Sequence, residues 1–262
     1  MPEGMQGRYV GLADEYARFW SPVIEPMGLR LLEMLPLGLA WRIVDIGCGT
    51  GNLISKIVAA APNARYLGLD RAANILSAAS KSGVPLVLAD GCRLPLRNSS
   101  FDVAVMAFAL FKFPSPLAGL TEAKRVLRPG GVLGITIWAG DTHVLPGDEI
   151  WEEVLVDVPR SPDESDRLED LNEIEKLRGV LESAGITGSD IHSETFERTW
   201  TPESLFALKS ELTHRARLVR LPVDEREKRL AQVRAYLAGM TPSSFIWRPS
   251  ILFARAQVPS TV

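Results

Sequence analysis

With 262 residues, 46% of them hydrophobic, the chain is long enough for one large α/β domain and is not a disordered or fibrous sequence. Its 29 basic and 32 acidic residues give a net charge of −3, and no lysine- or arginine-rich block marks a nucleic-acid footprint. The N-terminus lacks the basic residues of a secretion signal, and no apolar run reaches the ~18 residues of a membrane span. We therefore expect a cytoplasmic protein with a small-molecule partner, no nucleic acid and no membrane. The oligomeric state stays open, with a homodimer as one alternative.

The first stretch with a clear pattern, residues 9–35, has apolar positions at helical spacing that Pro22 and Pro26 interrupt. We predict two helices with a break between them, ahead of the first strand. A helix in this place commonly lies across a binding site as a lid. Tyr16 and Trp20 are therefore candidates for substrate contact, although aromatic residues at such spacing more often belong to a core.

Residues 43–51, Ile-Val-Asp-Ile-Gly-Cys-Gly-Thr-Gly, predict a strand and a glycine-rich turn, after which helical spacing resumes. A side chain at Gly47, Gly49 or Gly51 would keep a ligand away from the backbone, and glycine tolerates the dihedral angles of a tight turn. Because glycines also end strands for packing reasons, this stretch alone does not identify a ligand.

Two further predicted strands each end in an acidic residue. Asp70 closes the strand at residues 64–70 and lies 19 residues beyond Gly51. In doubly wound folds an acid at about that distance accepts hydrogen bonds from ribose hydroxyls. Asp90 follows the strand at residues 84–89, where its carboxylate could accept from an exocyclic amino group such as that of adenine. Together with the glycine turn, these acids favour a bound nucleoside.

The rest of the chain predicts a fourth strand at residues 101–108, apolar on both faces, and a fifth at 132–138. Alternating strands and helices imply right-handed crossovers and a parallel sheet whose ligand crevice lies at the carboxyl ends of the strands. Beyond residue 139 the pattern weakens and predicts, in order, a helix at 171–184, a sixth strand at 189–200, helical stretches at 203–218 and 223–237, and a last strand at 245–256.

We therefore predict an α/β fold, a doubly wound Rossmann-like sheet of seven mostly parallel strands. An N-terminal helical lid would precede it, and a helical cap would lie between the last two strands, since forty residues of helix are long for a connection. The expected limits are residues 1–40 for the lid, 41–200 for the ligand-binding core, 201–242 for the cap and 243–262 for the last strand.

The sequence resembles the class I S-adenosylmethionine-dependent methyltransferases, in particular the small-molecule branch typified by ubiquinone and menaquinone biosynthesis. The resemblance runs from Val44 to Trp138, with a similar lead-in helix before it. It rests on four stretches that match family motifs, namely residues 44–51 (VDIGCGTG), 68–70 (GLD), 89–90 (AD) and 127–131 (LRPGG). It implies S-adenosylmethionine as cofactor, S-adenosylhomocysteine as product, and in-line methyl transfer to a small, apolar or aromatic metabolite.

The resemblance also implies the residues that contact the cofactor. The methionine end would be held by Asp45 and the turn residues Gly47, Cys48, Gly49 and Gly51. The ribose would be bound by Asp70, with Arg71 beside the adenine. The adenine edge would meet Asp90, Gly91 and Cys92, and the carbonyl of Ala107 would face the amino group of the cofactor.

One departure follows the fourth strand, where many relatives carry histidines and this chain has FALFKFP at residues 108–114. It argues against a general base there and favours an apolar entrance for the acceptor, so Phe111 and Trp138 join the candidates for substrate contact. A base would add roughly 10²–10⁴-fold for a hydroxyl or acidic carbon acceptor. His143, in the loop after the fifth strand, is the first candidate and His214, in the cap, is the second. His192, in a predicted edge strand, is expected to be structural.

Three alternatives remain at this point. A nicotinamide-dependent oxidoreductase shares the fold and the ribose acid, but its fingerprint is Gly-x-Gly-x-x-Gly, and here the third glycine comes one residue early. A methyltransferase-like protein that uses the cofactor for a cyclisation or decarboxylation is compatible with every motif. A protein-binding module on a relic fold is disfavoured, because the glycines and both strand-end acids are present. The two cysteines lack metal-ligand spacing, so no metal is expected.

Overall fold

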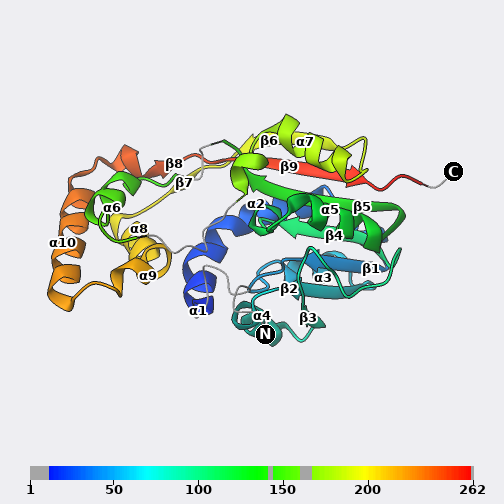
Figure 1. The fold of residues 1–262 in the computed structure, drawn as a ribbon, viewed down its shortest axis with the longest axis horizontal. Coiled ribbons are helices and arrows are strands. Elements are labelled where there is room, and N and C mark those ends of the chain that lie inside the picture. The colour runs from blue at the N-terminus through cyan, green and yellow to red at the C-terminus, as the bar shows by residue number, and fades with distance from the viewer. Residues whose placement is uncertain (1–11, 141–143, 160–166, 261–262) are drawn as a thin grey trace.

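The computed structural model describes residues 12–140, 144–159 and 167–260. At its centre lies a seven-stranded sheet in the order β3-β2-β1-β4-β5-β9-β6 (Figure 1). Its first five strands pair in parallel, and β9 runs antiparallel between β5 and β6. This confirms the predicted fold class. The strands are β1 (Arg42–Ile46), β2 (Arg65–Asp70), β3 (Leu86–Leu88), β4 (Phe101–Ala107), β5 (Leu127–Trp138), β6 (Asp190–Thr195) and β9 (Ser250–Gln257).

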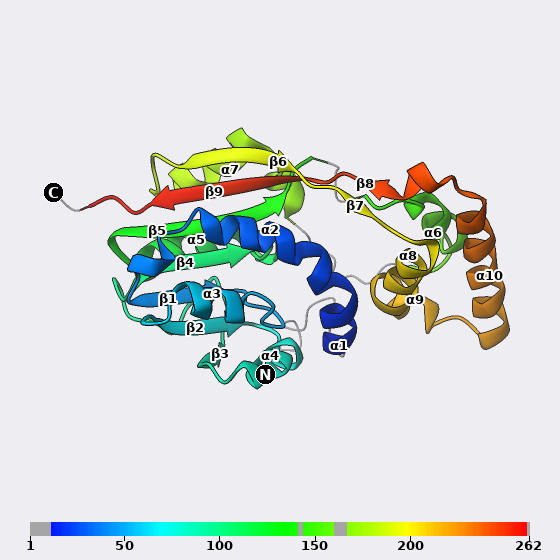
Figure 2. The ribbon, with the colours of Figure 1, turned by 180° about the vertical axis from the view of Figure 1, so that it is seen from behind.

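Helices cover both faces of the sheet, with α2 and α3 on one face and α5 and α7 on the other (Figures 1 and 2). α2 packs close to β5 because Gly134 has no side chain, and a Cβ there would come within 3.2 Å of Leu31 in α2 and 2.8 Å of Leu35 just after it. Within the described ranges, no helix is both long enough and apolar enough to cross a membrane. The helices around the sheet are α1 (Ala13–Glu15), α2 (Ser21–Glu33), α3 (Ile54–Ala60), α4 (Ala73–Ala79), α5 (Pro116–Val126) and α7 (Ile174–Ser183), with short 3₁₀ turns η2 (Leu37–Leu39), η3 (Ser80–Ser82), η4 (Leu110–Lys112) and η5 (Leu168–Asp170).

The N-terminal helix corrects one prediction, because its two prolines do not break it. α1 continues through a wide π-helical turn, η1 (Tyr16–Trp20), directly into α2. Pro22 lies where the π-helical turn η1 passes into α2, at a change in the helical hydrogen-bond pattern. Pro26 lies inside the helix and cannot donate to the carbonyl of Pro22, but that carbonyl accepts instead from Arg198 Nη1 at 3.5 Å. A residue far along the chain thus compensates for the proline.

A second group of helices lies beyond the carboxyl ends of the strands, and we call it the helical cap. A two-stranded ribbon, β7 (Arg198–Thr199) and β8 (Ile246–Trp247), connects it to β6 and β9. The sequence placed the cap within residues 201–242, whereas the structure also packs α6, from the β5–β6 connection, against α10. The cap comprises α6 (Asp148–Val154), α8 (Pro202–Leu208), a π-helical turn η6 (Lys209–Thr213), α9 (Arg215–Leu218), α10 (Val223–Gly239) and the turn η7 (Pro242–Phe245).

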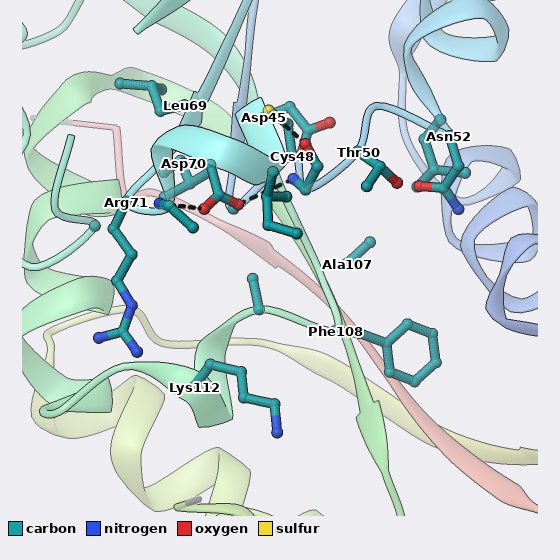
Figure 3. Close-up of a pocket in the computed structure, with 18 of the residues that line it drawn as sticks. Asp45, Cys48, Thr50, Asn52, Leu69, Asp70, Arg71, Ala107, Phe108 and Lys112 are labelled. Atoms are coloured by element: carbon teal, nitrogen blue, oxygen red, sulfur yellow. Dashed lines mark hydrogen bonds between the residues drawn. The ribbon is translucent and has the colours of Figure 1, made fainter. Parts of the chain in front are cut away.

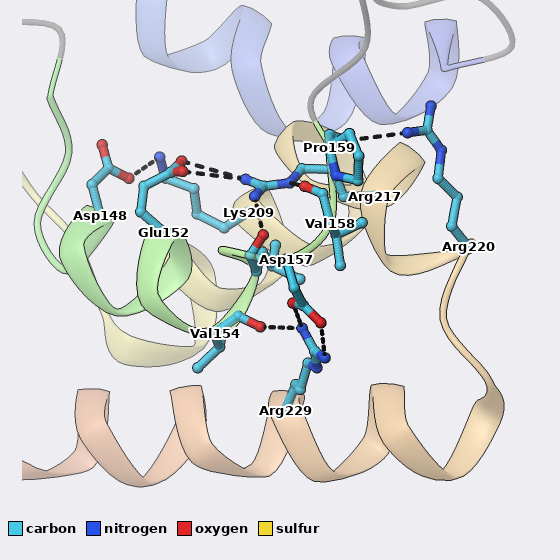
Figure 4. A network of polar contacts seen from close by, with 11 residues as sticks. Asp148, Glu152, Val154, Asp157, Val158, Pro159, Lys209, Arg217, Arg220 and Arg229 are labelled. Carbon is cyan, nitrogen blue, oxygen red and sulfur yellow. Dashed lines mark hydrogen bonds and ion pairs between the residues drawn. The ribbon is translucent and has the colours of Figure 1, made fainter.

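Arginine side chains join α6 to the cap helices that follow β6, as Figure 4 shows. Arg217, only 6% exposed, donates from α9 to the carbonyls of Leu155 and Val158. Arg229 of α10 donates to the carbonyl of Val154 at 2.6 Å and pairs with Asp157. These carbonyls end α6 or follow it, where a helix leaves acceptors without partners and favours positive charge. The contacts therefore fix α6 to the helices that come after β6.

Gly119, in α5, lies directly against the ring of Phe113, so a substitution at Gly119 measures how tightly the core is packed around that ring. The ring of Phe113 lies between two glycines, because a Cβ at Gly119 would come within 2.4 Å of it and a Cβ at Gly91 within 2.3 Å. Helical Gly→Ala changes usually stabilise by about 1 kcal/mol, but overpacking costs about 1–3 kcal/mol. We expect Gly119→Ala to lower the free energy of unfolding by about 1 kcal/mol in urea denaturation.

The matched control is Gly179→Ala in α7, where a Cβ would meet no heavy atom within 4 Å. This variant should gain stability, because only the helix propensity changes. A similar gain in both variants would show that Phe113 has room to move and would contradict the packing argument.

Candidate functional site

The turn after β1 is a glycine turn that closely approaches two other strand ends. Gly47, Gly49 and Gly51 have φ values of +83°, +58° and +82°, which side chains rarely adopt. A Cβ at Gly47 would lie 2.5 Å from the Cβ of Ala109, just beyond β4. The N–H groups of Gly47 and Cys48 both donate to the carbonyl of Leu69 in β2, at 2.7 and 2.9 Å. The turn therefore binds the carboxyl ends of β1, β2 and β4 together.

Asp45, in β1, places a buried carboxylate behind this turn. It is 3% exposed, and the hydroxyl of Tyr66 donates to its Oδ2 at 3.0 Å. Its Oδ1 is buried and has no hydrogen-bond partner among the described residues. Burial raises the pKa of Asp45 to about 7, because a dry environment disfavours the charged form. The site thus contains one acceptor atom that a cationic ligand group would satisfy.

Asp70 links the end of β2 to the glycine turn. Its Oδ2 accepts from the N–H of Gly49 at 3.0 Å, and its Oδ1 accepts from the N–H of Ala72 at 2.9 Å. Burial raises the pKa of this carboxyl, while the two backbone donors and the charge of Arg71 oppose the rise. Each oxygen keeps a further lone pair, so the oriented carboxylate can also accept from ligand hydroxyls.

One pocket extends along these strand ends, and Figure 3 shows many of its residues. Eight of the predicted cofactor residues line it, namely Asp45, Gly47, Cys48, Gly49, Asp70, Arg71, Gly91 and Ala107. Gly51, Asp90 and Cys92 do not line it. Asp90 Oδ1 instead accepts from the N–H of Cys92 at 2.9 Å, which shapes the turn that presents Gly91.

The acceptor side of the pocket differs from the expected set of aromatic residues. Tyr16 lines the pocket, but Trp20, Phe111 and Trp138 do not. Trp138 is 5% exposed and lies behind the lining, with its ring 5.9 Å from that of Trp20. The lining contains Phe108, Lys112 and Phe113 instead, which the sequence analysis did not single out as contacts. Their position directly after β4 is the sequence feature that could have identified them as pocket residues.

Phe108 has an unusual backbone conformation at the end of β4. Its φ is +53°, an arrangement that costs a non-glycine residue about 1–3 kcal/mol. Its N–H donates to the carbonyl and to the hydroxyl oxygen of Thr136, at 3.0 and 3.2 Å. Its ring packs against that of Trp138 at 4.7 Å. These contacts fix the ring at the pocket wall despite the strained backbone.

The candidate bases lie away from this lining or outside the described residues. His143 falls in the latter group. His214 is 7% exposed and stacks on Trp151 within the cap, with 5.1 Å between the rings. His192 lies on β6 beside Glu194, with 2.9 Å between its Nε2 and Oε1 of the carboxylate. Among the described residues, no histidine lines the pocket and no cluster of His, Cys, Asp and Glu could hold a metal ion.

Comparisons with known proteins, by sequence and by fold, both find similarity to methyltransferases. Residues 44–135 match a family model described as a methyltransferase domain. The demethylmenaquinone methyltransferase of Corynebacterium kroppenstedtii is 37% identical over 105 residues, which cover 40% of this chain and 44% of that protein. The chain thus spans about half the length of the curated relatives it matches.

Solved structures share the whole fold at low sequence identity. A SAM-dependent methyltransferase from Thermotoga maritima is 18% identical and has a TM-score of 0.59, over 95% of this chain and 97% of that one. The cyclase SpnF is also 18% identical, with a TM-score of 0.54 over 90% of this chain and 82% of that chain.

Sheet order, antiparallel β9 and the glycine turn define a class I S-adenosylmethionine-binding methyltransferase domain. Residues 44–135 match the model of this methyltransferase-domain family. This confirms the predicted cofactor. The residues fit it, because the open Oδ1 of Asp45 suits an ammonium group and the oriented Asp70 suits ribose hydroxyls.

The pKa of Asp45 predicts how cofactor affinity depends on pH. An ionised Asp45 attracts the ammonium group of the cofactor, and its ionised fraction rises as pH increases through about 7. We expect the affinity for S-adenosylhomocysteine to increase roughly tenfold from pH 6 to pH 8, measured by calorimetry, because the ionised fraction rises by that factor.

5′-Methylthioadenosine is the matched control ligand, since it keeps the nucleoside but lacks the amino-acid end. Its affinity should change little over the same pH range, and Asp45→Asn should remove most of the dependence for S-adenosylhomocysteine. An equal pH dependence for both ligands would assign the effect to another group, such as Asp70.

Proposed function

We propose that this protein transfers the methyl group of S-adenosylmethionine to a small acceptor with an apolar or aromatic body. The observation that carries the proposal is the arrangement of one pocket. A buried carboxylate with an open oxygen lies behind the glycine turn, and Tyr16, Phe108 and Phe113 line the same pocket. Such a pocket can hold a charged cofactor and an apolar acceptor next to each other.

The protein's own part in this reaction is positioning. S-adenosylmethionine, when bound, supplies a methyl group already activated on a positively charged sulfur. The glycine turn and Asp45 would hold the methionine end, and Asp70 would accept from the ribose hydroxyls. Fixing two reactants in line removes much of the entropic part of a barrier, so the chain needs no strong nucleophile of its own.

Exclusion of water is the second contribution. The ring of Phe108 lines the pocket and packs against Trp138 behind it, and Trp138 in turn packs on Trp247 with 5.6 Å between their rings. The N-terminal helix lies between the pocket and the cap, and Glu15 of α1 forms an ion pair with Arg215 of α9. An apolar wall of this kind would keep water from competing with the acceptor.

An aromatic acceptor is also compatible with the relatives. Several are named demethylmenaquinone methyltransferases, but their similarity covers only 40–45% of this chain. The cap, which would contact the acceptor, lies outside the residues that match the family model. We therefore propose the class of acceptor from the pocket wall and not from these names.

The proposal predicts transfer of isotope from methyl-labelled S-adenosylmethionine to an organic product. We expect label in phenolic or quinol-type acceptors, demethylmenaquinone among them, and production of equal amounts of S-adenosylhomocysteine, measured by mass spectrometry. Asp70→Ala should abolish turnover at low cofactor concentration, because it removes a carboxylate that the backbone orients toward the ligand. Asp102→Asn is the control, since Asp102 caps the N–H groups of Trp41 and Arg42 at the opposite end of β1.

Tight binding of S-adenosylmethionine without label in any acceptor would overturn methyl transfer. It would instead favour a reaction that uses the bound cofactor without consuming it, such as a cyclisation or a decarboxylation.

A further inference from the structure

The hydroxyl of Tyr66, in β2, holds the buried carboxylate of Asp45. It donates to Oδ2 at 3.0 Å, and the two residues are only 6% and 3% exposed. Among the residues that the structure describes, no other donor contacts this carboxylate, and its Oδ1 is left without a partner. The orientation of Asp45 therefore depends on one side chain from the neighbouring strand.

Asp70, the other carboxylate of the pocket lining, is held in a different way. Its two oxygens accept from the backbone N–H groups of Gly49 and Ala72. Backbone donors come with the fold itself, whereas the donor to Asp45 is a side-chain hydroxyl that this sequence places in β2. A substitution at Tyr66 can therefore remove that donor without altering the backbone of the glycine turn.

The room for this hydroxyl comes from Gly68, two residues further along β2. Side chains two positions apart in a strand lie on the same face, and a Cβ at Gly68 would lie 3.1 Å from the Tyr66 hydroxyl oxygen. It would also come within 3.0 Å of the Sγ of Cys48 in the glycine turn. In the pairing of β1 with β2, Gly68 is the partner of Asp45. The missing side chain thus lets the Tyr66 hydroxyl reach along the sheet to the carboxylate.

The other groups around Asp45 do not stabilise its charged form. Burial raises the pKa of Asp45, the hydrogen bond from Tyr66 lowers it, and the charge of Asp70 raises it again. Burial also raises the pKa values of Tyr66 and of the Cys48 thiol, so both groups keep their protons near neutral pH. On the other side of β1, the partner of Asp45 in β4 is the apolar Val105. Tyr66 is therefore a constant donor to this carboxylate.

We propose that Tyr66 is a positioning residue for cofactor binding, whose hydroxyl engages one oxygen of Asp45 and so keeps the other charged and free for the ammonium group of the cofactor. Tyr66 does not line the pocket, so it acts through Asp45. The inference rests on the part of the proposed function in which Asp45 holds the methionine end. A hydrogen bond to a buried carboxylate is strong, because no water replaces a missing donor there.

The test follows the affinity for S-adenosylhomocysteine in Tyr66→Phe, which removes the hydroxyl and keeps the ring. Without this donor, ionisation of Asp45 should move to higher pH by about one pH unit, as expected for one charge-assisted hydrogen bond. Calorimetry should therefore show an affinity loss of about tenfold at pH 6, about fivefold at pH 7 and about twofold at pH 8. A merely structural role would give the same loss at every pH.

The ionisation of Asp45 can also be measured without a ligand. In protein with isotope-labelled aspartate carboxyl groups, the NMR titration midpoint of Asp45 should lie at about pH 7 in wild type and higher in Tyr66→Phe. Incorporation of 3-fluorotyrosine at position 66 keeps the hydroxyl and makes it a stronger donor. It should move the midpoint to lower pH than in wild type, which tests the proposal even if Tyr66→Phe does not fold.

Tyr236→Phe is the matched control variant. Tyr236 also donates its hydroxyl to a carboxylate, that of Glu149 at 2.6 Å, but it belongs to the cap and does not line the pocket. Its substitution should change neither the affinity nor the midpoint of Asp45. 5′-Methylthioadenosine, which lacks the ammonium group, should bind equally to wild type and Tyr66→Phe. In an Asp45→Asn background, Tyr66→Phe should cause no further loss of affinity for S-adenosylhomocysteine.

The proposal fails if Tyr66→Phe leaves affinity and midpoint unchanged, lowers the affinity equally at every pH, or weakens both ligands alike. A wild-type affinity that does not vary with pH would overturn this inference together with the assignment of Asp45 to the methionine end. Methyl transfer is measured separately by mass spectrometry. The expected pH profiles without any labelled product would contradict methyl transfer, while the role of Tyr66 in cofactor binding would stand.

Discussion

The structure depends on the close contact between the turn after β1 and the ends of its two neighbouring strands. Gly47 approaches Ala109 so closely that no side chain fits between them, and its N–H donates to Leu69 on the other side. Asp70 then accepts from Gly49 in the same turn. Because three strand ends share one turn, a ligand that contacts it is oriented relative to β1, β2 and β4 at once. The same contact explains why residues far apart in sequence line one pocket.

Local patterns were enough to predict the sheet and several of the residues that line the pocket. The glycine turn, Asp70 and the alternation of strands and helices are each readable within a few residues, and parallel strands bring their carboxyl ends to one edge. The seven-stranded sheet follows from these rules. The cofactor, too, is indicated by the residues of the family motif, which all lie between positions 44 and 135.

What the sequence did not reveal depends on partners distant along the chain. From the sequence alone, Pro26 indicates a helix break. In the structure, Arg198 from the ribbon donates to the carbonyl of Pro22, which Pro26 cannot reach with an N–H. α6 joins the cap only because Arg217 and Arg229 bind the carbonyls at its end. The stretch at residues 108–113 is apolar apart from one charge, at Lys112. Its sequence pattern does not tell that Phe108, Lys112 and Phe113 are the side chains that face a pocket. The roles of individual residues at the acceptor side therefore stay predictions.

The position of β9 determines when the sheet can be completed during synthesis of the chain. This strand pairs with β5 on one side and β6 on the other, yet residues 250–257 are synthesised after both. Until they leave the ribosome, β6 has no partner in the sheet, and the ribbon that carries the cap lacks β8. The sheet and the cap are thus completed together, only after residues 250–257 are made, through contacts between residues far apart in sequence. Such contacts slow folding, and the unpaired edge of β5 needs protection from aggregation during that interval.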